Sequence, residues 1–211
     1  GESRRQRFLL DEELSRLGKV LAEMEREGIA HPAALKIIKV LAFTGCRCSE
    51  ILCLRWEYID LKQGVIRLPD AKAGARIVPL AAPARALLAS MSTRVSEGTV
   101  WTDAASGRPL SYWQLSKVWR RVRSRAGIDN ARMHDLRHTV GTYAGQAGLN
   151  AFVVRDLLGH KTLAMTGRYV EQHTDPLRSA ADKVAGRIES ALSGDTGGEV
   201  VTLPTPRVRV G

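Results

Sequence analysis

The sequence predicts a mainly α-helical domain with one small antiparallel β-sheet, an α+β fold. Apolar residues recur at helical spacing through most of the 211 residues. Short runs of β-branched residues, by contrast, are concentrated between positions 58 and 80. Hydrophobic residues make up 44% of the chain and charged residues 26%, a balance that is typical of a folded core and not of a disordered chain.

The first helices are bounded by capping residues and glycines. We expect Asp11 to cap a helix with apolar residues every three or four positions, and Gly28 to end it. Pro32 suits the first turn of a second helix, which Gly45 ends. A short helix is expected over Ser49–Leu54.

The small sheet is expected to follow these helices. Val65–Leu68 and Arg76–Val78 have the pattern of short strands on either side of a turn, in which Gly74 permits a positive φ. Tyr58–Leu61 is expected to add a third strand. The helical pattern then resumes in five segments: Pro83–Met91, Tyr112–Arg125, Arg132–Ala147, Ala151–Leu158 and Pro176–Leu192.

Composition divides the chain into three expected parts. Residues 1–7 form a basic leader, residues 8–192 one domain, and residues 193–211, rich in Gly, Thr and Pro, a flexible tail. No apolar run reaches the length of a membrane span, and the N-terminus lacks the apolar core of a secretion signal. We therefore expect a cytoplasmic protein.

The charge of the chain points to a polyanionic partner. Lys and Arg number 32 against 22 Asp and Glu, a net charge of +10. Such an excess favours nucleic acid, because neutralising phosphates releases condensed counterions; a membrane surface or a solubilising charge is the alternative. On the expected Tyr112–Arg125 helix, contacts to DNA are predicted for Arg120, Arg121 and Arg123, with a solvated helix face as the alternative.

Candidate chemistry begins on the expected Arg132–Ala147 helix. His134 and Arg137 are three residues apart and share one face, a combination that suits a phosphodiester. His134 and His138 also have the spacing of paired metal ligands. The guanidinium between them would repel a divalent cation, so we expect neither a metal nor another cofactor.

Three further segments carry polar residues at the ends of expected helices. They are Thr44-Gly45-Cys46-Arg47-Cys48-Ser49-Glu50, Leu157-Leu158-Gly159-His160 and Thr166-Gly167-Arg168-Tyr169-Val170. In the first, Ser49 is expected to cap the short helix. Taken singly, Arg47 fits a surface ion pair, His160 a C-terminal cap and Tyr169 half-buried packing.

In their order along the chain, these motifs resemble the signature of the tyrosine recombinases, the phage integrase family. The resemblance spans Phe8 to Leu192 and implies the catalytic-domain fold of that family for residues 8–192. It also implies DNA cleavage and rejoining through a covalent 3′-phosphotyrosine, without ATP or a metal. Most members carry a further DNA-clamping domain N-terminal to this one, so we expect the chain to be a fragment.

The resemblance assigns catalytic contributions residue by residue. Arg47 and Arg137 correspond to the two catalytic arginines. His134 matches the His of the His-x-x-Arg motif and is our candidate proton acceptor, His160 matches the later His or Trp, and Tyr169 matches the nucleophile.

Two supporting residues follow from the same resemblance. Lys72, at the tip of the expected hairpin, is similar to the lysine that protonates the leaving 5′-oxygen, with Lys62 and Arg76 as alternatives. Glu50 is similar to the acidic residue that supports the first arginine.

The resemblance implies a site-specific recombinase that integrates a phage or a genomic island. Its expected partners are double-stranded DNA, three further copies of the chain on synapsed DNA, and accessory DNA-bending proteins. The free protein is expected to be a monomer, with the Pro176–Leu192 helix docking either on its own domain or on a neighbour. A type IB topoisomerase and a non-catalytic DNA-binding protein are the alternatives.

Overall fold

The computed structural model describes residues 7–69, 74–91, 97–103, 106–163, 165–166 and 185. The chain divides into two units, Gly1–His173 and Thr174–Gly211, and every described residue except Ala185 lies in the first. Its helices are α1 (Asp11–Glu27), α2 (Pro32–Thr44), α3 (Cys48–Leu52), α4 (Ala82–Met91), α5 (Tyr112–Arg125), α6 (Met133–Gln146) and α7 (Ala151–Leu158). Its strands are β1 (Ile59–Asp60), β2 (Val65–Leu68) and β3 (Arg76–Pro79). The expected α+β fold class is confirmed.

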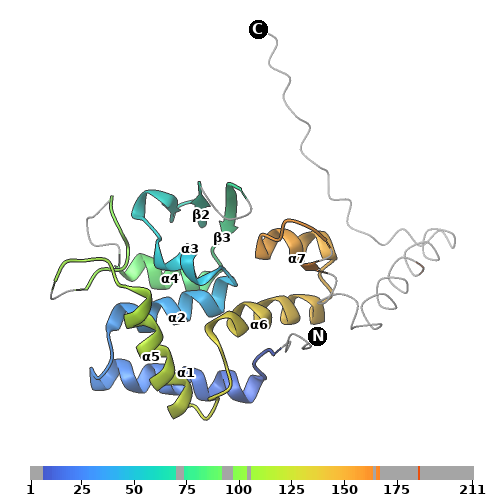
Figure 1. Cartoon of the computed structure of the whole chain (residues 1–211). Helices are drawn as coiled ribbons and strands as arrows, with labels where there is room; N and C mark the ends of the chain where they lie inside the picture. The colour runs from blue at the N-terminus through green and yellow to red at the C-terminus, as the bar shows by residue number, and fades with distance from the viewer. Residues whose placement is uncertain are drawn as a thin grey trace, which may run out of the picture. The chain divides into compact units, whose positions relative to one another are not determined.

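Helix α2 is the centre of the described domain. It contacts α1, α3, α4, α5 and α6, which surround it in Figure 1. Its sequence is largely apolar, with Lys36 and Lys39 on its partly exposed side, and such a helix is stable only when most of its surface is buried. Accordingly, its Leu35, Ile37, Ile38 and Val40 are completely buried. Within the described residues, no helix is both long enough and apolar enough to cross a membrane.

The three strands form an antiparallel sheet in the order β1-β2-β3, as expected. Ile66 pairs with Val78 and Leu68 with Arg76. Paired residues share one face of a sheet, so Arg76 faces inward, on the side of the buried Ile66 and Val78. Strand β1 is shorter than the expected strand Tyr58–Leu61, because a 3₁₀ turn over Trp56–Tyr58 precedes it.

Two predicted helix starts are wrong for the same physical reason. Asp11 is the first residue of α1, and the cap position is Leu10, whose N–H donates to Oε2 of Glu13 at 3.1 Å. Ser49 lies within α3, which the structure bounds at Cys48–Leu52 and not at Ser49–Leu54. In both helices an acidic side chain in the first turn reaches back to the exposed N–H, so the cap residue itself needs no polar side chain.

Several expected features fall outside the described residues. They are most of the basic leader, the tip of the hairpin with Lys72, the nucleophile candidate Tyr169, the Pro176–Leu192 helix and the tail at residues 193–211. The predictions for these segments stay predictions.

The segment that enters the domain is anchored on α6. Leu9 is completely buried, and its N–H donates to Oγ1 of Thr139 at 2.9 Å. The Tyr143 hydroxyl donates to Oδ1 of Asp11 at 2.5 Å and lies 3.3 Å from the Leu9 carbonyl oxygen. The start of the described chain is therefore held against the helix that carries His134 and Arg137.

Replacing the buried anchor should destabilise the domain. We expect Leu9→Ala to lower the free energy of unfolding by about 2–4 kcal/mol, because it leaves a cavity between the entering segment and α6. Leu10 is 57% exposed, so Leu10→Ala is the matched control and should change that free energy by about 0.5 kcal/mol or less. Urea unfolding followed by circular dichroism measures both variants, and equal losses would contradict the anchoring of Leu9.

Candidate active site

Four of the predicted catalytic residues, those that the structure describes, gather where α2 ends: Arg47, His134, Arg137 and His160. Gly45 terminates α2 with φ +63°, and a Cβ atom at this position would lie 2.9 Å from Cδ2 of Leu158 and 3.0 Å from Cγ1 of Val140. Only glycine adopts that left-handed conformation without strain while leaving room for these neighbours. The turn at Gly45 therefore brings α2, α6 and α7 together.

Arg137 of α6 is buried against this turn. Its side chain is nearly inaccessible, and Nη1 donates a 2.8 Å hydrogen bond to the carbonyl oxygen of Gly45. The carbonyl belongs to a helix C-terminus, where the backbone dipole favours a positive charge. The end of α2 thus fixes one guanidinium.

Arg47, two residues beyond Gly45, is fixed by two different groups. Its Nη1 lies 2.8 Å from Oε1 of Glu50, and its Nη2 donates to the carbonyl oxygen of Gly159 at 3.0 Å. The backbone N–H of Arg47 donates to Oε2 of Glu50 at 2.8 Å. Glu50 therefore contacts Arg47 at both the main chain and the side chain, a geometry compatible with the supporting contribution predicted for it.

Arg76, which the sequence offered only as an alternative to Lys72, is part of this cluster. Its Nη2 lies 2.7 Å from Oε2 of Glu50, and its Nη1 donates to the carbonyl oxygen of Leu157 at 3.4 Å. The sequence did hold a signal for this position. The alternation of strand residues places Arg76 on the same face as the apolar Val78.

Glu50 stays ionised although it is largely buried. Burial raises the pKa of its carboxyl group, but the hydrogen bonds from Arg76 and from the Arg47 backbone, together with the charge of Arg76, outweigh that effect and lower the pKa below 4.5. One carboxylate accordingly neutralises part of the charge of two guanidiniums.

The surroundings of His134 lower the pKa of its ring. The ring is partly buried. This burial is the largest cause that lowers the pKa of His134 below 6.5, and the positive charge of Arg137 is the second. The charge of Arg47 acts in the same direction. The ring meets His138 edge to face, with 4.8 Å between the ring centroids. A neutral imidazole can accept a proton.

His160 follows the glycine that ends α7. Gly159 adopts φ +64°, and the next ring, that of His160, has its Nδ1 2.9 Å from Oγ1 of Thr166. Thr166 is completely buried and precedes Tyr169 by three residues in the sequence. The structure thus brings Arg47, His134, Arg137 and His160 to one site. Glu50 contacts Arg47 there, and Arg76 contacts Glu50.

Lys62 does not lie at this site. It is exposed in the turn between β1 and β2, whereas Arg76 pairs with Leu68 at the opposite end of β2. The sheet therefore separates Lys62 from the arginine cluster, and Lys72 remains the predicted proton donor.

Two of the three α5 arginines predicted to contact DNA donate hydrogen bonds to backbone carbonyls of their own chain. Arg121 donates to the carbonyl oxygen of Ile29 at 2.9 Å, and Arg123 donates to that of Ala131 at 3.1 Å. Both join α5 to neighbouring segments of its own chain. Arg120 is exposed to solvent. DNA contacts remain a prediction for all three.

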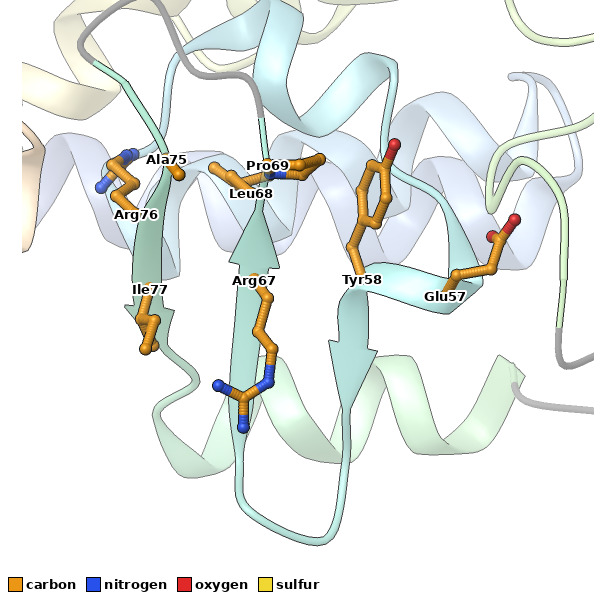
Figure 2. Close-up of a pocket in the computed structure, with 8 residues that line it drawn as sticks. All are labelled: Glu57, Tyr58, Arg67, Leu68, Pro69, Ala75, Arg76 and Ile77. Atoms are coloured by element: carbon orange, nitrogen blue, oxygen red, sulfur yellow. The ribbon is translucent and has the colours of Figure 1, made fainter.

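A groove on the sheet is lined in part by residues that flank the hairpin tip. Figure 2 shows its lining, which β2, β3 and the segment before β1 supply: Glu57, Tyr58, Arg67, Leu68, Pro69, Ala75, Arg76 and Ile77. Of these residues, Arg76 also belongs to the arginine cluster.

Known proteins resemble this chain in sequence and in structure. The shufflon-specific DNA recombinase of Escherichia coli is 36% identical over 141 residues, which are 66% of this chain and 35% of that protein. The catalytic domain of bacteriophage HP1 integrase is 26% identical, with a TM-score of 0.62 over 83% of this chain and 93% of that domain. XerH recombinase bound to difH before cleavage is 25% identical, with a TM-score of 0.67 over 82% of this chain and 53% of XerH.

Replacing the glycine at the centre of the site should destabilise the protein more than replacing an equivalent glycine elsewhere. Gly28 ends α1 with φ +65° and has open space around it, so Gly28→Ala should cost about 1–2 kcal/mol from conformation alone. Gly45→Ala should cost at least about 1 kcal/mol more, because its Cβ would press on Leu158 and Val140. Chemical denaturation measures both losses, and similar values would contradict the close packing at Gly45.

Acidification should destabilise the protein through His134. Its folded-state pKa lies below the value of 6.5 expected when unfolded, so the unfolded chain binds the proton more readily and stability falls as pH drops through this range. We expect the wild type to lose stability relative to His134→Gln between pH 7.5 and pH 5.5. Thermal unfolding at a series of pH values checks this difference, and a relative gain for the wild type on acidification would refute it.

The family of the chain follows from the sequence that surrounds this site. A profile of the phage integrase family matches residues 7–175, four-fifths of the chain. This chain spans only part of the curated relatives that it matches, between 35% and 57% of the length of three of them. The matched range contains every residue of the arginine and histidine cluster, and its fold is that of the HP1 integrase catalytic domain. The chain belongs to the phage integrase family.

Proposed function

We propose that this chain is the catalytic domain of a site-specific DNA recombinase, which cuts and rejoins double-stranded DNA through a covalent bond to Tyr169. The observation that carries the proposal is the fixed pair of guanidiniums, Arg47 and Arg137, held on either side of the turn at Gly45. His134 and His160 lie beside them. The names of the relatives, a recombinase and an integrase, support the same function.

The guanidiniums suit a phosphodiester at its transition state. That state is a crowded oxyanion, and Arg47 and Arg137 would bind its non-bridging oxygens with charges that persist at any working pH. His160 would donate a further hydrogen bond. Because these donors are positioned before substrate binds, the loss of either arginine should reduce the cleavage rate by about 10²–10³-fold.

The remaining residues would move the protons. A neutral phenol, whose unperturbed pKa is about 10, is a poor nucleophile, so Tyr169 needs a base, for which His134 is the candidate. The phenolic oxygen attacks phosphorus, the bond from phosphorus to the 5′-oxygen breaks, and Lys72 protonates the departing 5′-oxygen. Rejoining is the same displacement with a 5′-hydroxyl as nucleophile, so the phosphodiester bond energy is conserved.

The wider assembly belongs to the same proposal. Double-stranded DNA would be held mainly through its phosphates by the basic surface, including Arg120, Arg121 and Arg123. Four copies would meet on synapsed DNA, assisted by DNA-bending proteins, while the free chain is a monomer. Integration of a phage or a genomic island is the reaction proposed for the whole protein, which would act at the nucleoid.

Removing the phenolic hydroxyl of Tyr169 should abolish the covalent intermediate. The substrate is a library of DNA duplexes in which the protein-binding arm is randomised. Each duplex carries a nick, so that cleavage releases a short segment on the 3′ side of the cut. Once this segment is lost, rejoining is impossible and the covalent adduct accumulates. We expect denaturation-resistant adducts with the wild type, at least about 10³-fold fewer with Tyr169→Phe, and unchanged amounts with the matched control Tyr58→Phe. Gel mobility and sequencing of the bound DNA measure the result.

The other outcomes of this experiment separate the alternatives. An adduct that survives Tyr169→Phe would refute the nucleophile assignment. Relaxation of any supercoiled plasmid without sequence preference would favour a topoisomerase. Salt-dependent DNA binding with no adduct in the whole library would favour a non-catalytic DNA-binding protein.

A further inference from the structure

Arg76 differs from the other cations of the sheet in where its side chain goes. Figure 2 shows Arg76 at the edge of β3, its guanidinium directed away from Arg67 of β2. Arg67 is half exposed and lies near Asp60. The Arg76 side chain is only 10% exposed, and its Nη2 lies 2.7 Å from Glu50 and 3.6 Å from Sγ of Cys46. Such burial of a charge requires a close counter-charge, which Glu50 supplies, although Nε of Arg76 is buried without a hydrogen-bond partner.

Both groups that hold Arg47 are themselves in contact with Arg76. The first is Glu50, whose two carboxylate oxygens bind the two guanidiniums separately, Oε1 to Arg47 and Oε2 to Arg76. The second is Gly159, whose carbonyl oxygen accepts a hydrogen bond from Nη2 of Arg47. A Cβ atom on Gly159 would lie 2.6 Å from Cδ of Arg76, so the side chain packs directly on this residue.

This arrangement determines what the loss of Arg76 would do. Without it, one oxygen of Glu50 keeps only the Arg47 backbone N–H, and the carboxylate can rotate toward it. The peptide at Gly159 loses its packing neighbour, and the carbonyl oxygen of Leu157 loses its hydrogen bond from Nη1 of Arg76. Both acceptors of the Arg47 guanidinium would then be free to shift. Misplacement of a catalytic group by about 1 Å can reduce a rate about 10²-fold.

We propose that Arg76 is a positioning residue: through Glu50 and Gly159 it fixes the Arg47 guanidinium and ties β3 to the turn that precedes His160. The proposal rests on the recombinase function proposed above. Arg76 does not replace Lys72 as proton donor, because a guanidinium keeps its proton at any working pH. Lysine cannot replace Arg76 fully either, since one ammonium cannot reproduce a planar fork that reaches Glu50 and Leu157 from separate nitrogens.

The kinetic test compares Arg76→Gln with Arg67→Gln, the same change on the neighbouring strand. With a nicked duplex selected from the library, we expect Arg76→Gln to lower the single-turnover rate of adduct formation at saturating DNA about 10–100-fold. The half-saturating DNA concentration should stay within about 3-fold, because the residue is buried. Arg76→Lys should recover part of the rate, and Arg67→Gln should leave the rate unchanged.

A double substitution separates positioning from general destabilisation. If Arg76 acts through Glu50, Glu50→Gln combined with Arg76→Gln should be within about 3-fold of the slower single variant, whereas independent effects would multiply. Multiplying effects, an unchanged rate in Arg76→Gln, or a loss confined to DNA affinity would each overturn the proposal.

A measurement on the free protein keeps the two proposals distinguishable. Side-chain ¹⁵N NMR reports rotation of the Arg47 guanidinium, whose signals are assigned by their loss in Arg47→Lys. Because both Nη groups are hydrogen-bonded, rotation should be slow in the wild type and in Arg67→Gln, and fast in Arg76→Gln. Unchanged slow rotation in Arg76→Gln overturns the positioning. A wild type that forms no adduct overturns the recombinase function alone.

Discussion

The reversal of the chain at Gly45 is the constraint on which the site depends. The central helix α2 is buried over most of its surface, and the residues at its C-terminal end, Thr44 to Cys46, are buried too, so its last carbonyls need donors from the protein. Arg137 supplies one such donor at the Gly45 carbonyl. The absence of a side chain at Gly45 lets α6 and α7 approach closely enough to deliver Arg137 and His160 to the same place as Arg47.

Concentrated positive charge is the second physical feature of the site. The carboxylate of Glu50 contacts both Arg47 and Arg76, and each of Arg47, Arg76 and Arg137 also donates a hydrogen bond to a backbone carbonyl. Carbonyls stabilise a guanidinium without neutralising its charge. One carboxylate does not neutralise two guanidiniums, so the site keeps positive charge, which suits binding of a phosphodiester and, after burial, contributes to lowering the pKa of His134.

The spacing of apolar residues and the positions of helix-ending glycines predicted most of the fold. The order of the helices, the three-stranded sheet and the glycines that end α1, α2 and α7 were all expected and are observed. Helix starts were less predictable, since Asp11 and Ser49 are good cap residues in isolation. In the folded chain, Glu13 and Glu50 bind the first free N–H from inside the helix, and this contact decides where each helix begins.

The sequence by itself determined the family, the fold class and the identities of the candidate catalytic residues, because motif order and helical periodicity are properties of the chain alone. Tertiary structure decided which cations share the site: it excluded Lys62 and placed Arg76 against Glu50 and Gly159. The contacts of Arg76 join residues 26 and 81 positions apart in the chain. No local pattern encodes such contacts, because they exist only once β3, α3 and α7 have packed around the end of α2.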